Sequence, residues 1–328
     1  MTDAARAYSL RVAKPSRLDA TLAEVRALGA APTAEALRPH LSHKAGVVVA
    51  AAAKIAAKHE LRALAPDLET AFARLFDDAT KTDPGCFGKL AAAEALRALD
   101  VNAPALFLRG VAYQQREGYG GADSAGALRV CCAGGLLQTR HPYALAEIAP
   151  LLADPVANVR AGVATMLGPI GLEATDALLR LKVKTGDAEP EVIGACLKGL
   201  LESSVARNRA FVLDAIEGAE SAVVQLALLA LGETHDESVV APLRTYADTT
   251  SDDDVRSAAL LGLSLARLAS ANDYLVGLIE DASEKRGIEA LRALAPQRYD
   301  AALVARARAA AEARGPRVAA VADEVLGD

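Results

Sequence analysis

A recurring spacing of just over thirty residues constrains this chain more than any other feature. Val159, Val192, Val223 and Val255 follow one another at intervals of 33, 31 and 32 residues, and each opens a run of apolar residues with helical spacing. A helical hairpin of this length cannot bury its own apolar face, so a period of this size predicts stacked copies. The pieces between the predicted helices are too short for the crossovers of a parallel sheet. The spacing therefore favours an array of helical hairpins.

One hairpin is especially clear in the stretch 150–168. A first helix ends in two leucines, and Asp154 follows, placed to cap a second helix by accepting a backbone N–H. Val159, Val163 and Leu167 then recur every four residues and form one apolar face. We expect Leu167 in the core, where an aspartate at this position would unfold the middle of the array.

The composition agrees with helix-on-helix packing. Hydrophobic residues make up 52 % of the chain, yet aromatic residues make up only 4 % and tryptophan is absent. Alanine and leucine carry most of the apolar content and are strong helix formers, whereas strand-like runs rich in β-branched and aromatic residues are missing. The predicted fold class is all-α.

The repeat resembles a known family. The pattern Pro-Leu-Leu-x-Asp, then Val-Arg-x-x-Ala, then Leu-Gly is similar to the HEAT repeat, in particular to the short bacterial version related to phycobilisome-lyase-type repeats. It is formed by Pro150, Leu151, Leu152, Asp154, Val159, Arg160, Ala164, Leu167 and Gly168, and again, less closely, by Pro242, Leu243, Asp248, Val255, Arg256, Ala259 and Leu263. The resemblance implies a right-handed α-solenoid, an α-α superhelix of about nine antiparallel helix pairs.

We expect a single solenoid over residues 1–328 without separate domains. Residues 1–16 form a leader or N-terminal cap, 17–141 degenerate repeats, 142–296 regular repeats and 297–328 a C-terminal capping pair. Such an array leaves a long surface for recognition.

Some residues of the repeat have a predicted structural role. Asp154 caps a helix and Leu167 fills the core. Arg160 and Arg256 follow the valine of the pattern, so each can reach a carboxylate or a carbonyl of the adjacent repeat. We interpret both arginines as structural contacts rather than as ligand contacts.

The charge is uneven along the chain. The net charge is −6, but residues 1–60 carry a balance of +4 and residues 141–328 a balance of −10. An acidic C-terminal half argues against a grip on a phosphate backbone along the whole array. Six basic residues fall on successive predicted second helices, which line the concave surface in HEAT-like solenoids, and could form a basic strip: Lys44, Lys54, Lys58, Lys89, Arg97 and Arg129. A plain solvated face is the alternative.

The segment 114–123 departs from the repeat because it is long and rich in glycine. It has neither the preceding strand nor the Lys-Ser/Thr pair of a phosphate-binding loop. Tyr113, Arg116 and Tyr119 place aromatic and cationic side chains on a projecting turn, and such residues are enriched in binding hot spots. We therefore consider a partner contact here, with a solvated insertion as the alternative.

Catalytic, cofactor and metal sites are not predicted. The four cysteines form no Cys-x-x-Cys pair, and no further ligand is spaced to complete a site with the histidines of the N-terminal region. The acidic turn 248–254 lacks the glycine and terminal glutamate of a calcium loop. The N-terminus has no secretory apolar region, and the most apolar stretch, 47–57, is too short to span a bilayer. We expect a cytoplasmic protein without membrane partners.

These observations favour a non-catalytic scaffold that binds a protein or peptide on its concave face. One alternative is a nucleic-acid-binding protein that uses the basic N-terminal second helices, although the acidic balance makes nucleic acid a poor partner. The other alternative, a bilin-lyase-like enzyme or accessory, depends on the repeat resemblance alone.

Overall fold

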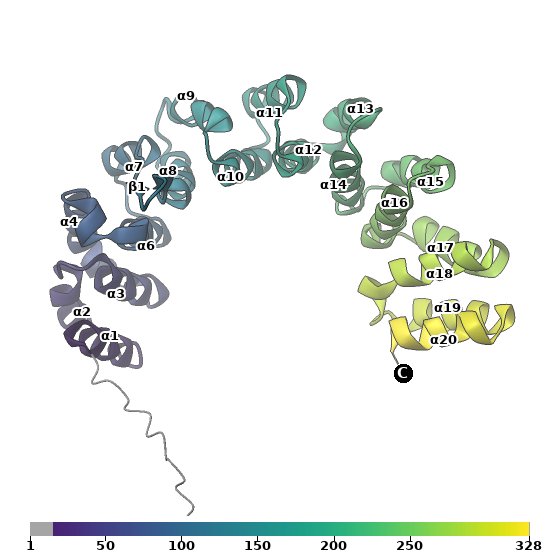
Figure 1. Cartoon of the computed structure of the whole chain (residues 1–328), viewed down its shortest axis with the longest axis horizontal. Helices are drawn as coiled ribbons and strands as arrows, with labels where there is room; N and C mark the ends of the chain where they lie inside the picture. The colour runs from purple at the N-terminus through teal and green to yellow at the C-terminus, as the bar shows by residue number, and fades with distance from the viewer. Residues whose placement is uncertain (1–15, 328) are drawn as a thin grey trace, which may run out of the picture. The chain divides into compact units, whose positions relative to one another are not determined.

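The computed structural model describes residues 16–327, most of which lie in α-helices joined by short turns (Figure 1). The chain divides into two compact units, Met1–Ile148 and Ala149–Asp328, called unit 1 and unit 2 below. The leader expected at 1–16 lies outside the described residues except for Ser16. Whether the two units join into the expected single solenoid over 1–328 stays a prediction.

In unit 1 the helices alternate between two layers. Helices α3, α6 and α8 pack one on the next and form the second-helix layer, while α2, α4, α7 and α9 form the first-helix layer, and α1 packs on α2 and α3. The helices are α1 (Arg17–Leu28), α2 (Ala34–Leu41), α3 (Gly46–Lys58), α4 (Ala65–Arg74), α5 (Ala79–Thr82), α6 (Phe87–Ala98), α7 (Pro104–Val111), α8 (Gly126–Gln138) and α9 (Ala144–Ile148).

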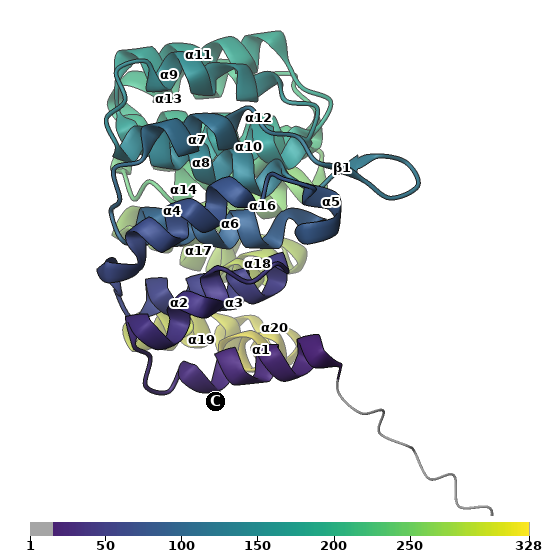
Figure 2. The same cartoon turned by 90° about the vertical axis from the view of Figure 1, so that its left-hand side faces the viewer.

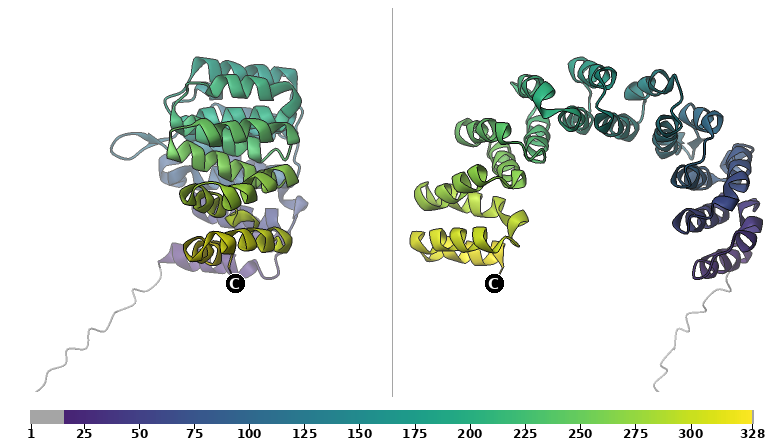
Figure 3. Two further views of the ribbon diagram at one scale, coloured as in Figure 1. Left: turned by 90° about the vertical axis from the view of Figure 1, so that its right-hand side faces the viewer. Right: turned by 180° about the vertical axis from the view of Figure 1, so that it is seen from behind.

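Unit 2 repeats the same arrangement more regularly. Helices α10, α12, α14, α16, α18 and α20 pack in succession as the second-helix layer, and α11, α13, α15, α17 and α19 lie on the other side, as Figure 3 shows from behind. The helices are α10 (Ala157–Leu167), α11 (Glu173–Thr185), α12 (Pro190–Ser203), α13 (Val205–Ile216), α14 (Ser221–Gly232), α15 (Val240–Thr249), α16 (Asp253–Ala266), α17 (Ala269–Asp281), α18 (Glu284–Ala293), α19 (Ala301–Arg314) and α20 (Pro316–Leu326).

Both layers agree with the predicted all-α solenoid class. Short 3-10 turns lie between several of the helices: η1 (Arg62–Leu64), η2 (Pro84–Cys86), η3 (Ala149–Ala153), η4 (Gly168–Ile170), η5 (Glu237–Val239) and η6 (Ala295–Gln297). No helix within residues 16–327 is both long and apolar enough to cross a membrane.

Glycines allow neighbouring second helices of unit 2 to touch through their backbones. A Cβ placed on Gly232 of α14 would lie 2.2 Å from the carbonyl oxygen of Gly262 in α16. A Cβ on Gly168 would lie 2.5 Å from the Cα of Gly199 in α12. These distances are shorter than any van der Waals contact. The close spacing of neighbouring helices therefore requires glycine, which has no side chain, at these positions.

The stretch around Asp154 differs from the sequence expectation in its capping. Val159, Val163 and Leu167 are fully buried, as the apolar face requires. However, α10 begins at Ala157 and its N-cap residue is Val156, without a side-chain cap. The Asp154 carboxylate accepts the Val156 N–H at 2.8 Å, so it closes the turn before the helix instead of capping the helix.

The segment 114–123 contains the two strands found in the described part of the chain. Strand β1 (Arg116–Glu117) pairs antiparallel with β2 (Ala122–Asp123), with Arg116 opposite Asp123. Figure 2 shows this hairpin projecting from unit 1 beside α5. The sequence predicted a projecting loop here but not its strands.

Candidate partner-binding surfaces

The β-hairpin of unit 1, formed by β1 and β2, is anchored to a buried ion pair between Asp83 and Lys89. Asp83 and Lys89 are fully buried, and the Lys89 Nζ donates to the Asp83 carboxylate at 2.9 Å and to the Leu75 carbonyl at 3.0 Å. The Asp83 carboxylate also accepts the backbone N–H groups of Gly88 and Lys89, which lie in the first turn of α6. A buried pair of this kind persists because each charge is neutralised and hydrogen-bonded.

Two hairpin residues continue this network outward. The Gln115 side-chain amide donates to the Asp83 carbonyl oxygen at 2.8 Å and to Glu117 Oε1 at 2.9 Å. Glu117 Oε2 accepts the Gly85 N–H at 2.8 Å. The hydrogen bond from Gln115 holds the pKa of Glu117 below its ordinary value. The first strand is therefore fastened to the turn that precedes α6.

Arg129 fastens the second strand and corrects one prediction. Its guanidinium donates to Asp123 at 2.6 Å and to the Tyr113 carbonyl at 2.9 Å, and its side chain is only 2 % exposed. Lys89 is also buried. The predicted basic strip is therefore wrong at both positions, because these cations neutralise Asp123 and Asp83 inside the unit and do not face solvent.

The three residues predicted to contact a partner on this segment have different environments. Tyr119 is fully exposed at the tip, between Gly118 and Gly121, whose φ angles of +69° and +64° suit glycine. Arg116 is exposed on β1. Tyr113 instead packs edge-on against a phenylalanine ring with 4.6 Å between centroids, and its hydroxyl donates to the Gln115 side chain. Only Arg116 and Tyr119 are open to a partner.

A groove opens between α1, α3 and α6 of unit 1. It has a volume of about 560 Å³ and is lined by Leu22, Arg26, Val47, Ala50, Ala51, Lys54, Ile55 and Phe87. Phe87 is 59 % exposed although it begins α6, a helix of the second-helix layer. We call this feature the α1–α3 groove. The sequence predicted Lys54 as a partner contact, but it did not predict the apolar residues that line the groove beside it.

Among the remaining cations of the predicted strip, Lys54 and Lys58 lie one helical turn apart and are exposed on α3. Lys44 is exposed just before α3 and lines a separate hollow beside α1. Arg97 is half-buried, and its guanidinium occupies the space in which a Cβ on Gly134 would lie, 2.7 Å away. The structure thus brings Lys54 into the same groove as Arg26, whereas neither Lys58 nor Arg97 lines that groove.

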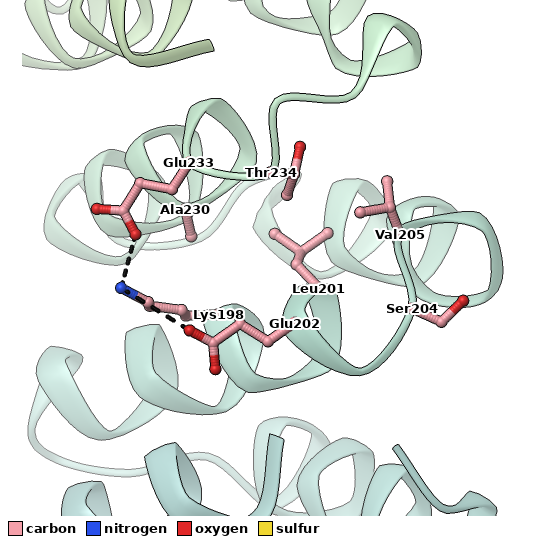
Figure 4. A pocket seen from close by; sticks show the side chains of 8 residues that line it. All are labelled: Lys198, Leu201, Glu202, Ser204, Val205, Ala230, Glu233 and Thr234. Carbon is pink, nitrogen blue, oxygen red and sulfur yellow. Dashed lines mark hydrogen bonds and ion pairs between the residues drawn. The ribbon is translucent and has the colours of Figure 1, made fainter. Parts of the chain in front are cut away.

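A second hollow, of about 350 Å³, lies in unit 2 between α12, the start of α13 and α14 (Figure 4). Its cation, Lys198, contacts Glu233 at 2.6 Å and Glu202 at 4.0 Å. The hydrogen bond to Glu233 raises the pKa of Lys198 above its ordinary value. Because two carboxylates already neutralise this lysine, the hollow offers no unpaired cation to a ligand.

Arg160 and Arg256 bridge successive hairpins of unit 2. The Arg160 guanidinium holds Asp187, in the turn before α12, through two hydrogen bonds of 2.7 Å, and it also donates to the Asp154 carbonyl. Arg256 pairs with Glu289 of α18 at 3.1 Å. Both arginines thus contact a carboxylate of the next hairpin, which is the geometry of a structural contact.

The cysteines and the acidic turn show no reactive geometry. All four cysteines are buried, and burial raises the pKa of the Cys86 and Cys196 thiols to about 12. In the turn 248–254, Asp252 caps α16 by accepting two backbone N–H groups. Within residues 16–327, no three His, Cys, Asp or Glu side chains are grouped to hold a metal ion.

Part of the chain is similar to a known protein family. A family model described as HEAT repeats matches residues 179–264, which run from within α11 to within α16. The matched residues lie inside the range 142–296 in which the sequence pattern is most regular. No curated protein matches the chain.

Proposed function

Because this chain is a HEAT-like repeat protein, we propose that it is a non-catalytic scaffold that binds a protein or peptide on the surface of its second helices. HEAT repeats generally mediate protein–protein interaction, and stacked hairpins present extended surfaces suited to it. The resemblance to HEAT repeats predicts that this surface is the concave one.

The observation that carries the proposal is the α1–α3 groove. Its apolar lining comes largely from α3, a second helix, and the rest comes from α1 and α6. A hollow that combines apolar side chains with a few charged ones is typical of a binding site. The other hollow on second helices, beside α12 and α14, has its lysine already paired with two glutamates.

The projecting hairpin of unit 1 supports the same function as a second contact. Its base is fastened by Gln115, Glu117 and Asp123, so the exposed Tyr119 is presented by a rigid support. A rigid aromatic side chain binds at a low cost in conformational entropy. We propose Arg116 and Tyr119 as partner contacts, whereas Tyr113 supports the hairpin from within.

A nucleic-acid partner receives less support than a protein. A phosphate backbone needs a continuous path of exposed cations, and Lys89 and Arg129 are buried on the two second helices that follow α3. The cations left exposed on α3 are too few for such a path.

Affinity purification of the full chain from its native host, with quantitative mass spectrometry, tests the proposal. We expect one or a few proteins to be enriched over an unrelated bait, and to be reduced by Tyr119→Ala or by Lys54→Glu with Lys58→Glu. Equal recovery by wild type and both variants would contradict binding on these surfaces, and recovery of no protein would contradict the scaffold function itself.

A further inference from the structure

We propose that the α1–α3 groove binds an acidic amphipathic peptide segment of a partner protein. Its apolar side chains would lie against Ile55 and Phe87, and its carboxylates would pair with Arg26 and Lys54. The proposal rests on the proposed scaffold function and adds the chemistry of the partner.

The apolar wall of the groove is held in place by the chain around it. Phe87 stands at the edge, 59 % exposed, and Gly85 makes room for its ring, since a Cβ on Gly85 would lie 2.5 Å from it. Gly85 also has a φ of +74°, a conformation that favours glycine. Gly85 is in turn bound to the hairpin through Glu117. The exposed Phe87 ring is therefore held in place by the surrounding backbone, and a bound partner can cover it.

The charges of the groove are all of one sign. Arg26 from α1 and Lys54 from α3 are exposed, and none of the eight lining residues is acidic. Neither cation has a salt bridge within residues 16–327; the Asp19 carboxylate, which lies in the field of Arg26, instead accepts hydrogen bonds from Ser16. The hollow around Lys198 is the contrary case, because Glu202 and Glu233 neutralise its cation.

Charge complementarity selects an acidic occupant for this groove. Six of its eight lining residues are apolar, so an apolar stripe beside the carboxylates fits it better than a phosphate backbone does. The N-terminal segment 1–15 of this chain carries three basic residues and one acidic residue, so its charge repels the groove. A segment of another protein with Leu or Phe at helical spacing and Asp or Glu between them fits both features.

A peptide-display selection tests the proposal without knowledge of the partner. A library of random 16-residue peptides is selected on the immobilised full-length chain, and each enriched peptide is synthesised with a fluorescent label. Binding is then measured by anisotropy against wild type, Arg26→Glu/Lys54→Glu and Phe87→Ala. The matched control, Arg62→Glu/Lys81→Glu, reverses two exposed cations of unit 1 outside the groove. Circular dichroism checks that each variant keeps the helicity of the wild type.

We expect enriched peptides to combine acidic and large apolar residues. Their affinity should fall about tenfold or more in the groove double variant and in Phe87→Ala, and stay unchanged in the matched control. Peptides in which Glu is replaced by Lys should bind the double variant more tightly than they bind the wild-type protein. Selection of neutral or basic peptides, equal binding to wild type and double variant, or no enrichment overturns the proposal.

Duplex DNA of 20 base pairs serves as a separate probe of the groove. Binding of this duplex that is lost in Arg26→Glu/Lys54→Glu would overturn the peptide proposal in favour of a nucleic acid. If host proteins are still enriched by the full chain while the peptide selection fails, the scaffold function stands and only the acidic-peptide groove is wrong.

Discussion

Replacement of Lys89 by methionine should destabilise unit 1 and release the projecting hairpin. Methionine keeps the length and apolar stem of lysine but removes its charge and its donors. The Asp83 carboxylate would then stay fully buried with only two backbone N–H donors, and the Leu75 carbonyl would lose its partner. The change thus isolates the contribution of one buried cation.

The geometry sets the size of the effect. Two unit charges 2.9 Å apart attract by about 6 kcal/mol at an effective dielectric constant of about 20, and much of this only offsets their desolvation. Removal of one partner leaves an uncompensated buried charge, which typically costs about 3–5 kcal/mol. For a unit of this size, that loss lowers the melting temperature by roughly 6–20 °C. Asp83→Asn in the same chain should recover at least part of the loss, because the stranded charge is gone.

Thermal melting followed by circular dichroism measures the loss of stability, and hydrogen–deuterium exchange of peptides covering 83–125 locates it in unit 1. We expect faster exchange of the hairpin in Lys89→Met, since Gln115 is bound to the Asp83 carbonyl. If Lys89→Met melts within about 2 °C of wild type, or if Asp83→Asn/Lys89→Met is no more stable than Lys89→Met, the buried pair does not support this region as described.

Three further predictions concern unit 2. Leu167→Asp buries a charge in a fully apolar site and should abolish the cooperative melting of unit 2; unchanged melting and helicity would show that this face is not core. Arg160→Met should cost about 2 kcal/mol in urea unfolding at pH 7. Arg160 lowers the pKa of Asp187, so the stability it adds is present above the ordinary carboxyl value of 3.8 and is lost as the pH falls below it. Wild type should therefore lose stability more steeply than the variant below pH 4, and parallel curves would refute this. Gly232→Ala should cost about 1–3 kcal/mol by forcing α14 from α16, whereas Gly277→Ala, where a Cβ meets nothing within 4 Å, should be neutral or slightly stabilising; equal effects would refute the role of close backbone contact.

Much of the fold follows from local patterns in the sequence. The apolar face of α10 is readable because Val159, Val163 and Leu167 recur at helical spacing, and all three are buried. The period near thirty residues gives the stacking of hairpins, since each copy needs a neighbour to cover it. The role of Asp154 could not be predicted exactly. The helix starts two residues later than expected, so the Asp154 side chain closes the preceding turn and does not cap the helix.

The candidate surfaces were harder to predict because they depend on contacts between distant residues. Whether a lysine is exposed depends on which carboxylate meets it, so Lys54 and Lys89 look alike in the sequence although one is exposed and the other fully buried. The one signal in the sequence for the burial of Lys89 was Asp83, a possible ion-pair partner that lies six residues earlier, just before the helix. The exposed Phe87 gave no signal, since an aromatic residue at a helix start is normally assigned to the core.

Site-specific photo-crosslinking in the native host tests the central claim most directly, namely that a partner protein binds the second-helix surface. A photoreactive phenylalanine analogue is placed at Ala51, in the α1–α3 groove, or at Thr70, which is exposed on α4 in the first-helix layer. We predict a crosslinked protein at position 51 and none at position 70. Crosslinks at position 70 alone, or at neither position, would contradict the account.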